Sequence, residues 1–346
     1  MGEVREDVWD VGTGRPTTLF HLSAGDLRVR LCPLGASVVG VDAPGRDNAV
    51  RDVCLQLPTP DGYRENGSNF GAVVGRYANR IGGSAFELDG RSYSLEANNG
   101  PNCLHSGSAN LARREWAAEA STDGGDPTVR FKVTDPDGSG GFPGEVDVEA
   151  TYVLRADNTL SLRYRATADA PTVVSLTNHA YWNLAGHDTG DARPQRVRIA
   201  ASKMLEVDAT VLPTGELPDV AGTPFDFRTA TAVDARWDDL AGRGLNGYDH
   251  CYALDSPGLD AVAAEMHDPV SDRLMTVRTT LPGCQLYTAA HLDRSPGNGG
   301  YGPYAGLCLE CQMFPDSPNR PAFPSTILRP GETFDHTTEM TFGLRA

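Results

Sequence analysis

The chain has 346 residues, of which 40% are hydrophobic, and it carries a formal net charge of −16. This length is sufficient for a large buried core, whereas the strong negative charge disfavours nucleic acids and anionic membrane surfaces as partners. The acidic N-terminus has no signal-peptide pattern and no segment has the length of a hydrophobic membrane span, so we expect a cytoplasmic protein.

Short alternating segments closed by glycine or proline dominate the chain. The alternation is typical of β-strands, and 38 glycines and 24 prolines separate the segments at short intervals. The sequence therefore predicts an all-β fold, a large antiparallel β-sandwich with few short helices, as one domain over residues 1–346. No glycine-rich phosphate loop opens a helix, which argues against a nucleotide cofactor. The clearest strand patterns cover 27–31, 37–41, 128–133, 145–154 and 160–165.

The most informative segment runs from Gly75 to Gly107. Its centre, 85–95, alternates on both sides of Asp89-Gly90, a dipeptide typical of a two-residue hairpin turn. Arg80 and His105 flank this hairpin, so both side chains would face one pocket if the segment folds back on itself. The alternative is that Arg80 forms a structural ion pair and His105 belongs to a turn.

Further along the chain, 177–184 places His179 in a predicted strand rich in polar and aromatic residues. A histidine there is either a satisfied core residue or a proton donor and acceptor. Asp249 follows Gly247-Tyr248 and is predicted to lie on a turn, and Gln285 lies in the strand pattern of 283–288. Taken singly, turn capping for Asp249 and solvent exposure for Gln285 are the favoured interpretations.

The apolar strand pattern of 306–312 contains a single carboxylate, Glu310. A buried glutamate is unfavourable unless it is paired or used, and alternation puts Glu310 and Gln312 on one face of the strand. Cys308 and Cys311 have the spacing of redox and zinc motifs, but strand geometry sends side chains three apart to opposite faces. The odd total of seven cysteines and the lack of a second pair favour buried free thiols over a metal or redox site.

Taken together, these segments resemble the aldose 1-epimerase (galactose mutarotase) family. Further matching strings extend the resemblance almost from end to end, and they lie at 141–144, 212–216, 222–228, 312–319, 323–325 and 328–332. The resemblance implies a β-sandwich with an open sugar cleft, no metal or cofactor, and a free aldose such as galactose or glucose as substrate. It leaves open whether the protein is a monomer or a homodimer.

The resemblance also implies roles for individual residues. Glu310 corresponds to the general base and His179 to the general acid, and the substrate-binding groups are Arg80, His105, Asp249, Asn79 and Gln285. The chain departs from the usual family pattern at Ser106, Trp182, Cys311 and Ala289-Ala290, which puts sugar preference in doubt and removes no catalytic group.

Anomer interconversion requires a base to take the C1 hydroxyl proton while an acid protonates the ring oxygen. We expect Asp249, if it is close, to raise the pKa of His179 and so enlarge the protonated fraction. Three alternatives remain: a hexose-phosphate mutarotase, a glycoside hydrolase that pairs Glu310 with Asp249, and a non-catalytic sugar-binding protein. The acidic chain disfavours the first alternative, and the presence of both an acid and a base disfavours the last.

Overall fold

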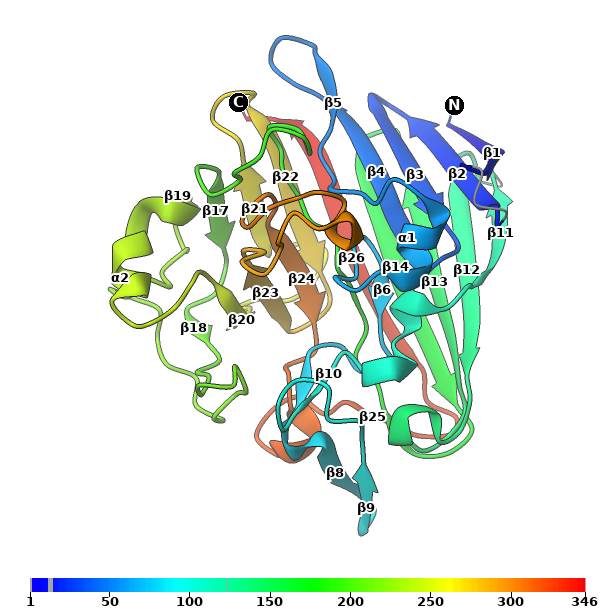
Figure 1. The fold of residues 1–346 in the computed structure, drawn as a ribbon, viewed down its shortest axis with the longest axis vertical. Coiled ribbons are helices and arrows are strands. Elements are labelled where there is room, and N and C mark those ends of the chain that lie inside the picture. The colour runs from blue at the N-terminus through cyan, green and yellow to red at the C-terminus, as the bar shows by residue number, and fades with distance from the viewer. Residues whose placement is uncertain (1, 12–14, 123, 346) are drawn as a thin grey trace.

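The computed structural model describes residues 2–11, 15–122 and 124–345. Its largest sheet has nine antiparallel strands, and the connection between the neighbours β13 and β14 is short (Figure 1). In sheet order, these strands are β11 (Ala117–Ser121), β12 (Thr128–Asp135), β13 (Val146–Leu154), β14 (Thr159–Ala168), β26 (Phe334–Leu344), β22 (Arg273–Thr279), β21 (Ala264–His267), β17 (Arg196–Ile199) and β19 (Thr231–Ala232).

A second sheet of five consecutive strands packs on one half of the first. Apolar side chains alternate along both sheets and meet in one core, where the rings of Phe20 and Phe131 lie edge to face at 5.9 Å. The Tyr152 hydroxyl donates to the Ala36 carbonyl at 2.7 Å and links the layers. The strands of this sheet are β1 (Glu3–Trp9), β2 (Thr17–Ala24), β3 (Leu27–Cys32), β4 (Ser37–Pro44) and β5 (Val50–Asp52).

A third sheet of four strands packs on the other half of the large sheet. Leu286 and Leu309 belong to the same buried core as Met340 of the large sheet. Trp182 pairs its backbone with Cys54 on one side and Leu307 on the other, which joins the two smaller sheets into one layer. The strands of this third sheet are β18 (Lys203–Met204), β20 (Asp249–Ala253), β23 (Gly283–Tyr287) and β24 (Cys308–Gln312).

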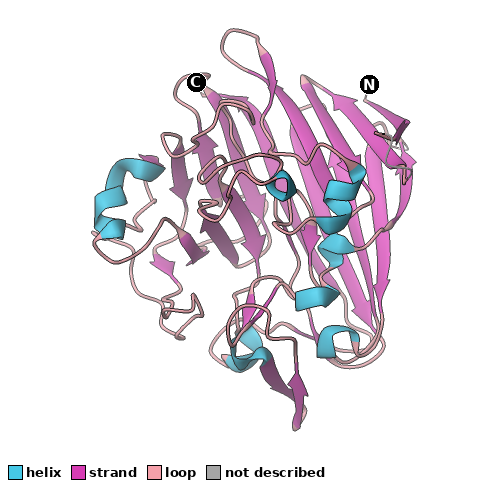
Figure 2. Cartoon of the chain, in the orientation of Figure 1, coloured by secondary structure: helices cyan, strands magenta, loops and turns pink. Residues whose placement is uncertain are grey.

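The predicted antiparallel all-β fold is therefore confirmed, and each of the five clearest strand patterns lies within or overlaps an observed strand. Among the described residues, α-helix is limited to α1 (Pro60–Glu65) and α2 (Trp237–Ala241), and Figure 2 shows how little of the chain is helical. No helix in the described part of the chain is long and apolar enough to cross a membrane.

The hairpin predicted at Asp89-Gly90 is also confirmed. β8 (Ala85–Leu88) pairs with β9 (Arg91–Ser94), with Leu88 opposite Arg91, so the loop has two residues. Both have positive φ, 51° and 75°, as a type I′ turn requires. The remaining short pairs are β7 (Arg80–Ile81) with β10 (Cys103–Leu104), β6 (Val73–Val74) with β16 (Thr177–Asn178), and β15 (Thr172–Val173) with β25 (Ile327–Leu328).

Two local predictions were wrong. The strand expected over 177–184 is limited to β16, and His179 lies just beyond it, because the following backbone makes single bridges to two different neighbours. Asp249 is the first residue of β20 and lies just after the turn, which ends at Gly247 with a φ of 123°. Alternation along the chain does not show over how many residues a strand pairs with a neighbouring strand.

Candidate active site

A cavity of about 760 Å³ opens over the outer face of the four-stranded sheet. Its lining comes from segments far apart in the sequence, and the fold brings them together through β7, β10, β20, β24 and the segment after β16. Six of the seven predicted site residues line it: Asn79, Arg80, His105, His179, Asp249 and Glu310. The seventh, Gln285, does not line the cavity.

Asn79, Arg80 and His105 form one corner because β7 pairs with β10, which places Arg80 opposite Leu104. Two hydrogen bonds connect Asn79 and His105. The His105 N–H donates to the Asn79 carbonyl at 2.9 Å, and the Asn79 N–H donates to His105 Nδ1 at 3.1 Å. Since Nδ1 is an acceptor, the neutral ring of His105 carries its proton on Nε2.

The His105 imidazole is neutral for electrostatic reasons as well. Burial lowers the pKa of His105 well below its usual value, and the nearby His179 and Arg80 act in the same direction. The ring therefore offers one N–H donor to a ligand. Arg80 is held in place from two sides, since its Nε donates to Asn99 Oδ1 at 3.0 Å and a terminal nitrogen lies 3.4 Å from Asp249 Oδ2.

Asp249 and Gln285 form the second corner, on adjacent strands β20 and β23. Gln285 Nε2 donates to Asp249 Oδ1 at 2.6 Å, and Asp249 Oδ2 meets Arg80. Gln285 is 2% exposed, so the predicted solvated position was wrong, and its side chain is not part of the cavity lining. The amide holds the Asp249 carboxylate in a fixed orientation.

Glu310 projects into the cavity from the middle of β24, a strand whose neighbouring side chains Leu309 and Cys311 face the hydrophobic core. This is the division of faces that alternation predicted. The carboxyl group is 3% exposed, and its Oε2 atom has no hydrogen-bond partner. Burial raises the pKa of Glu310 well above its usual value, the charge of Asp249 adds to this effect, and the charge of Arg80 opposes it.

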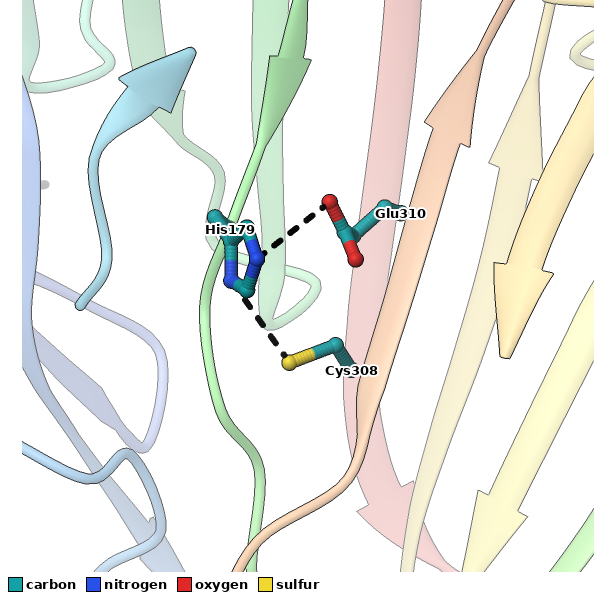
Figure 3. A group of neighbouring side chains, drawn as sticks. All are labelled: His179, Cys308 and Glu310. Carbon is teal, nitrogen blue, oxygen red and sulfur yellow. Dashed lines mark hydrogen bonds and ion pairs between the residues drawn. The ribbon is translucent and has the colours of Figure 1, made fainter. Parts of the chain in front are cut away.

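His179 faces Glu310 across the cavity end. Its backbone is fixed between two hydrogen bonds to Gly71 and Ala72, and its Nε2 lies 3.7 Å from Glu310 Oε2 (Figure 3). Burial lowers the pKa of His179 from 6.5 to about 4, and the charge of Asp249 opposes this without overcoming it. The predicted direction of the Asp249 effect on the pKa of His179 is therefore confirmed, but desolvation of the ring outweighs it.

An aromatic wall that the sequence analysis missed completes the cavity. Tyr181, Tyr287 and His291 line it, and the Tyr287 hydroxyl is hydrogen-bonded to His291 Nδ1. His291 Nε2 lies 3.2 Å from the Ser68 hydroxyl. Tyr287 lies two residues after Gln285, so strand alternation alone could have placed both on the same face.

The cysteines behave as predicted in most respects. All seven are free and buried, and the side chains of Cys308 and Cys311 point to opposite faces of β24. Cys308 also contacts a polar group, since its Sγ atom lies 3.7 Å from His179 Nδ1. Among the described residues, His179, Cys308 and Glu310 form a cluster of side chains that commonly bind metal ions. One potential ligand atom from each residue lies within 4.8 Å of the other two.

The sequence of this chain matches a known protein family. A sequence model described as aldose 1-epimerase matches residues 18–341. The galactose mutarotase of Bos taurus is 38% identical over 328 residues, covering 94% of each chain. The aldose 1-epimerase of Escherichia coli strain K12 is 37% identical and covers 95% of this chain and 96% of its own. This chain belongs to the aldose 1-epimerase family.

Solved structures of aldose 1-epimerase relatives have the same fold. A galactose 1-epimerase from Lactobacillus acidophilus superposes with a TM-score of 0.87 at 25% identity, covering 100% of both chains. An aldose epimerase homologue from C. elegans superposes with a TM-score of 0.86 at 27% identity, covering 99% of this chain and 100% of its own.

The departures from the family pattern lie mostly away from the cavity. Trp182 and Cys311 face the core, and Ser106 is buried, where its hydroxyl accepts from the Tyr77 N–H at 2.9 Å. Ala290 lines the cavity, and Ala289 next to it is buried with a φ of 53°. Of these four departures from the epimerase pattern, only the alanine pair can therefore act on a bound sugar directly.

Proposed function

We propose that this chain interconverts the α and β anomers of a free aldose by general acid and base catalysis. The observation that carries the proposal is the approach of His179 Nε2 to Glu310 Oε2, 3.7 Å apart at the wall of one cavity. The ring oxygen and the hydroxyl oxygen of an anomeric centre are bonded to the same carbon. Two proton carriers this close together suit transfers at two atoms that are themselves neighbours.

In the proposed reaction, Glu310 takes the proton of the C1 hydroxyl while His179 gives a proton to the ring oxygen. The bond between C1 and the ring oxygen breaks, and C1 becomes the aldehyde carbon. Rotation about the C1–C2 bond turns the other face of the aldehyde toward the ring hydroxyl. Reclosure returns one proton to His179 and one from Glu310 to the C1 oxygen, so the pair ends as it began.

The pair needs one proton in total for this cycle. The pKa of Glu310 is raised well above its usual value and that of His179 is lowered to about 4, so the carboxyl group holds this proton more strongly than the imidazole does. Moving the proton to His179 gives the reactive carboxylate and imidazolium. Sugar hydroxyl groups donating to Glu310 favour that transfer, and the positive charge of Arg80 acts in the same direction.

The remaining cavity groups are proposed to orient the sugar. Arg80 and His105 are N–H donors and Asp249 is an acceptor. Asn79 lies next to Arg80 and His105, where β7 pairs with β10. Gln285 is assigned a supporting role, since it fixes Asp249 and does not line the cavity. Because these groups are already held in place, they can orient the bound sugar and so lower the entropic cost of reaching the reactive geometry.

A glycoside hydrolase that uses Glu310 and Asp249 as its carboxyl pair is less well supported. Both oxygens of Asp249 already have partners, Gln285 at one and Arg80 at the other. Lone pairs remain that can accept from a sugar hydroxyl, but the two partners hold the carboxylate in the position of an orienting group. His179 is the proton carrier that faces Glu310 within 4 Å, which favours epimerisation over hydrolysis.

Polarimetry tests the proposal directly. Freshly dissolved α-D-galactose and α-D-glucose change optical rotation as they approach the anomeric equilibrium, and the protein should accelerate this change without altering its end point. The Glu310→Gln variant at the same concentration is the matched control. Equal rates with and without the wild-type protein for both sugars would reject an epimerase acting on these aldoses.

A further inference from the structure

Three side chains with different donor atoms meet at the buried end of the cavity. His179 offers an imidazole nitrogen, Cys308 a thiol sulfur and Glu310 a carboxyl oxygen, and each residue is at most 5% exposed. We propose that this cluster is a binding site for a thiophilic divalent cation of the Zn²⁺ type, and that the bound cation excludes the sugar. The metal would be an inhibitor, and the proposed reaction does not use it.

The spacing of the donors supports the proposal. Cys308 Sγ lies 3.7 Å from His179 Nδ1 and Glu310 Oε2 lies 3.7 Å from His179 Nε2, so the two groups approach different ring nitrogens from the same strand (Figure 3). A metal ion can take only one of these nitrogens, and with one donor atom from each residue the three atoms lie within 4.8 Å of one another. Ligand atoms around tetrahedral zinc are about 3.5 Å apart, given bond lengths of about 2.0–2.3 Å. Small side-chain rotations would therefore bring one atom of each residue into a common coordination sphere.

A second observation points to a missing ligand. The Oε2 atom of Glu310 is buried without any hydrogen-bond partner, although a buried carboxyl oxygen normally has one. His179 and Glu310 both line the cavity, whereas fully buried Cys308 lies behind that wall. A cation entering through the cavity would meet the nitrogen and oxygen first, and its fourth position would remain open to water or to a sugar oxygen.

The donor set selects the class of metal. Hard cations such as Mg²⁺ and Ca²⁺ require oxygen ligands, whereas a sulfur, a nitrogen and an oxygen together suit Zn²⁺ and Co²⁺. Binding forms one metal–nitrogen, one metal–sulfur and one metal–oxygen bond. The protons of the thiol and of the carboxyl group pass to solvent, and no redox step is involved.

The proposed catalytic groups and the proposed metal ligands overlap at His179 and Glu310. A bound cation would occupy the lone pairs that the acid and the base need, so mutarotation should stop, and a bound sugar should slow metal entry. Metal binding itself is independent of the proposed function, whereas the inhibition rests on it.

Co²⁺ titration of the full chain tests the binding claim, because cobalt bound to a thiolate has a charge-transfer band in the near ultraviolet. We expect this band to saturate at one equivalent and Zn²⁺ to displace the cobalt. Cys308→Ser should abolish the band and weaken Zn²⁺ binding more than about 100-fold, since even residues that only support metal ligands contribute 10–100-fold. Absence of a thiolate band in the wild-type protein would overturn the proposal, whatever the behaviour of any variant.

Cys32→Ser is the matched control. Cys32 is also fully buried, it donates to the Leu34 carbonyl at 3.7 Å, and serine keeps that donor. The control should retain the cobalt band and its affinity, and loss of the band in this variant instead would place the site elsewhere. If Cys308→Ser does not fold, Cys308→Ala replaces it, and a band that persists in a folded Cys308 variant would overturn the proposal.

A polarimetric arm separates failure of this inference from failure of the proposed function. Zn²⁺ should inhibit mutarotation by the wild-type and Cys32→Ser proteins at the concentration that fills the cobalt-detected site, and galactose should protect. Full activity with the site filled would overturn the inhibition claim. A cobalt band at Cys308 in a protein that does not accelerate mutarotation would support the metal site and reject the proposed function.

Discussion

At the scale of single residues, burial decides where the proton of the site resides. An exposed glutamate and histidine at neutral pH would be a carboxylate and a partly protonated imidazole. Here burial raises the pKa of Glu310 and lowers that of His179 to about 4, so both groups are pushed toward their neutral forms. The two residues are therefore best treated as one titrating pair that carries a single proton.

Removing either member of this pair should remove most of the activity. Glu310→Gln and His179→Asn each keep the size and polarity of the side chain but cannot exchange a proton in the same way. We expect kcat for mutarotation to fall by about 10²–10⁴-fold in each variant, the usual effect of one proton-transfer group. Polarimetric rates measure this loss, and a variant that keeps near-wild-type kcat would exclude that residue from proton transfer.

The pH dependence of kcat/KM should be bell-shaped, with limbs set by the perturbed pKa values. The active pair has one proton. Below a pH of about 4 a second proton binds to His179, and above the raised pKa of Glu310 the single proton is lost, so activity falls in both directions. A constant rate across both limbs would contradict proton transfer by this pair.

Asp249→Asn tests the electrostatic part of that profile. The charge of Asp249 raises the pKa of both Glu310 and His179, so neutralising it should move the alkaline limb to lower pH, in addition to any loss from weaker sugar binding. Asp208→Asn is the control, since Asp208 is an exposed carboxylate that lines the same cavity. An alkaline limb that stays in place in Asp249→Asn would contradict the coupling.

At the scale of elements, strand alternation and one buried arginine position the site. Arg76 precedes β7 and is fully buried, and its Nε donates to Asp135 Oδ2 at 2.6 Å. Its other nitrogens donate to backbone carbonyls at Pro136, Pro143 and Gly144. The guanidinium thus ties the start of the site segment to the turn that follows β12.

We expect Arg76→Met to destabilise the fold by about 3–5 kcal/mol, because it removes the hydrogen-bond donor to the buried Asp135 Oδ2 atom and to the Pro143 and Gly144 carbonyls. Urea unfolding followed by circular dichroism measures this change. Arg163→Met is the comparison, since Arg163 pairs with Asp335 on an exposed part of the large sheet and should contribute about 1 kcal/mol or less. Equal effects of the two substitutions would refute the structural role of Arg76.

At the scale of the whole molecule, the net charge of −16 bears on the choice of substrate. The cavity itself mixes signs, with Arg80 and Arg243 among its cations and Asp208 and Asp249 among its anions. No concentrated positive patch offsets the global negative field within this lining. A neutral sugar enters such a site more readily than a sugar phosphate does.

We expect kcat/KM for D-glucose 6-phosphate to be about tenfold or more below that for D-glucose at low ionic strength. The gap should narrow with added salt, because screening shortens the range of the field from about 30 Å at 0.01 M to about 8 Å at 0.15 M. A neutral 6-O-methyl glucose controls for added size. A phosphate that reacts faster than the free sugar at low salt would favour the hexose-phosphate alternative.

Much of the fold and part of the site follow from the sequence. Alternation of period two identified the strands, Asp89-Gly90 fixed a hairpin, and the single carboxylate of β24 fell on the face opposite Leu309. The family strings located six residues that line one cavity. These features are local, or depend on short strings, so they can be read without knowing which strands become neighbours.

Only the tertiary structure decided how those residues act on one another. The depth of burial outweighed the effect of Asp249 on the pKa of His179, and chain packing placed Gln285 behind Asp249 and Cys308 next to the imidazole. Each of these facts depends on segments more than thirty residues apart in the chain coming into contact. Local alternation determines which face a side chain occupies, but desolvation and electrostatic coupling depend on everything that packs around it.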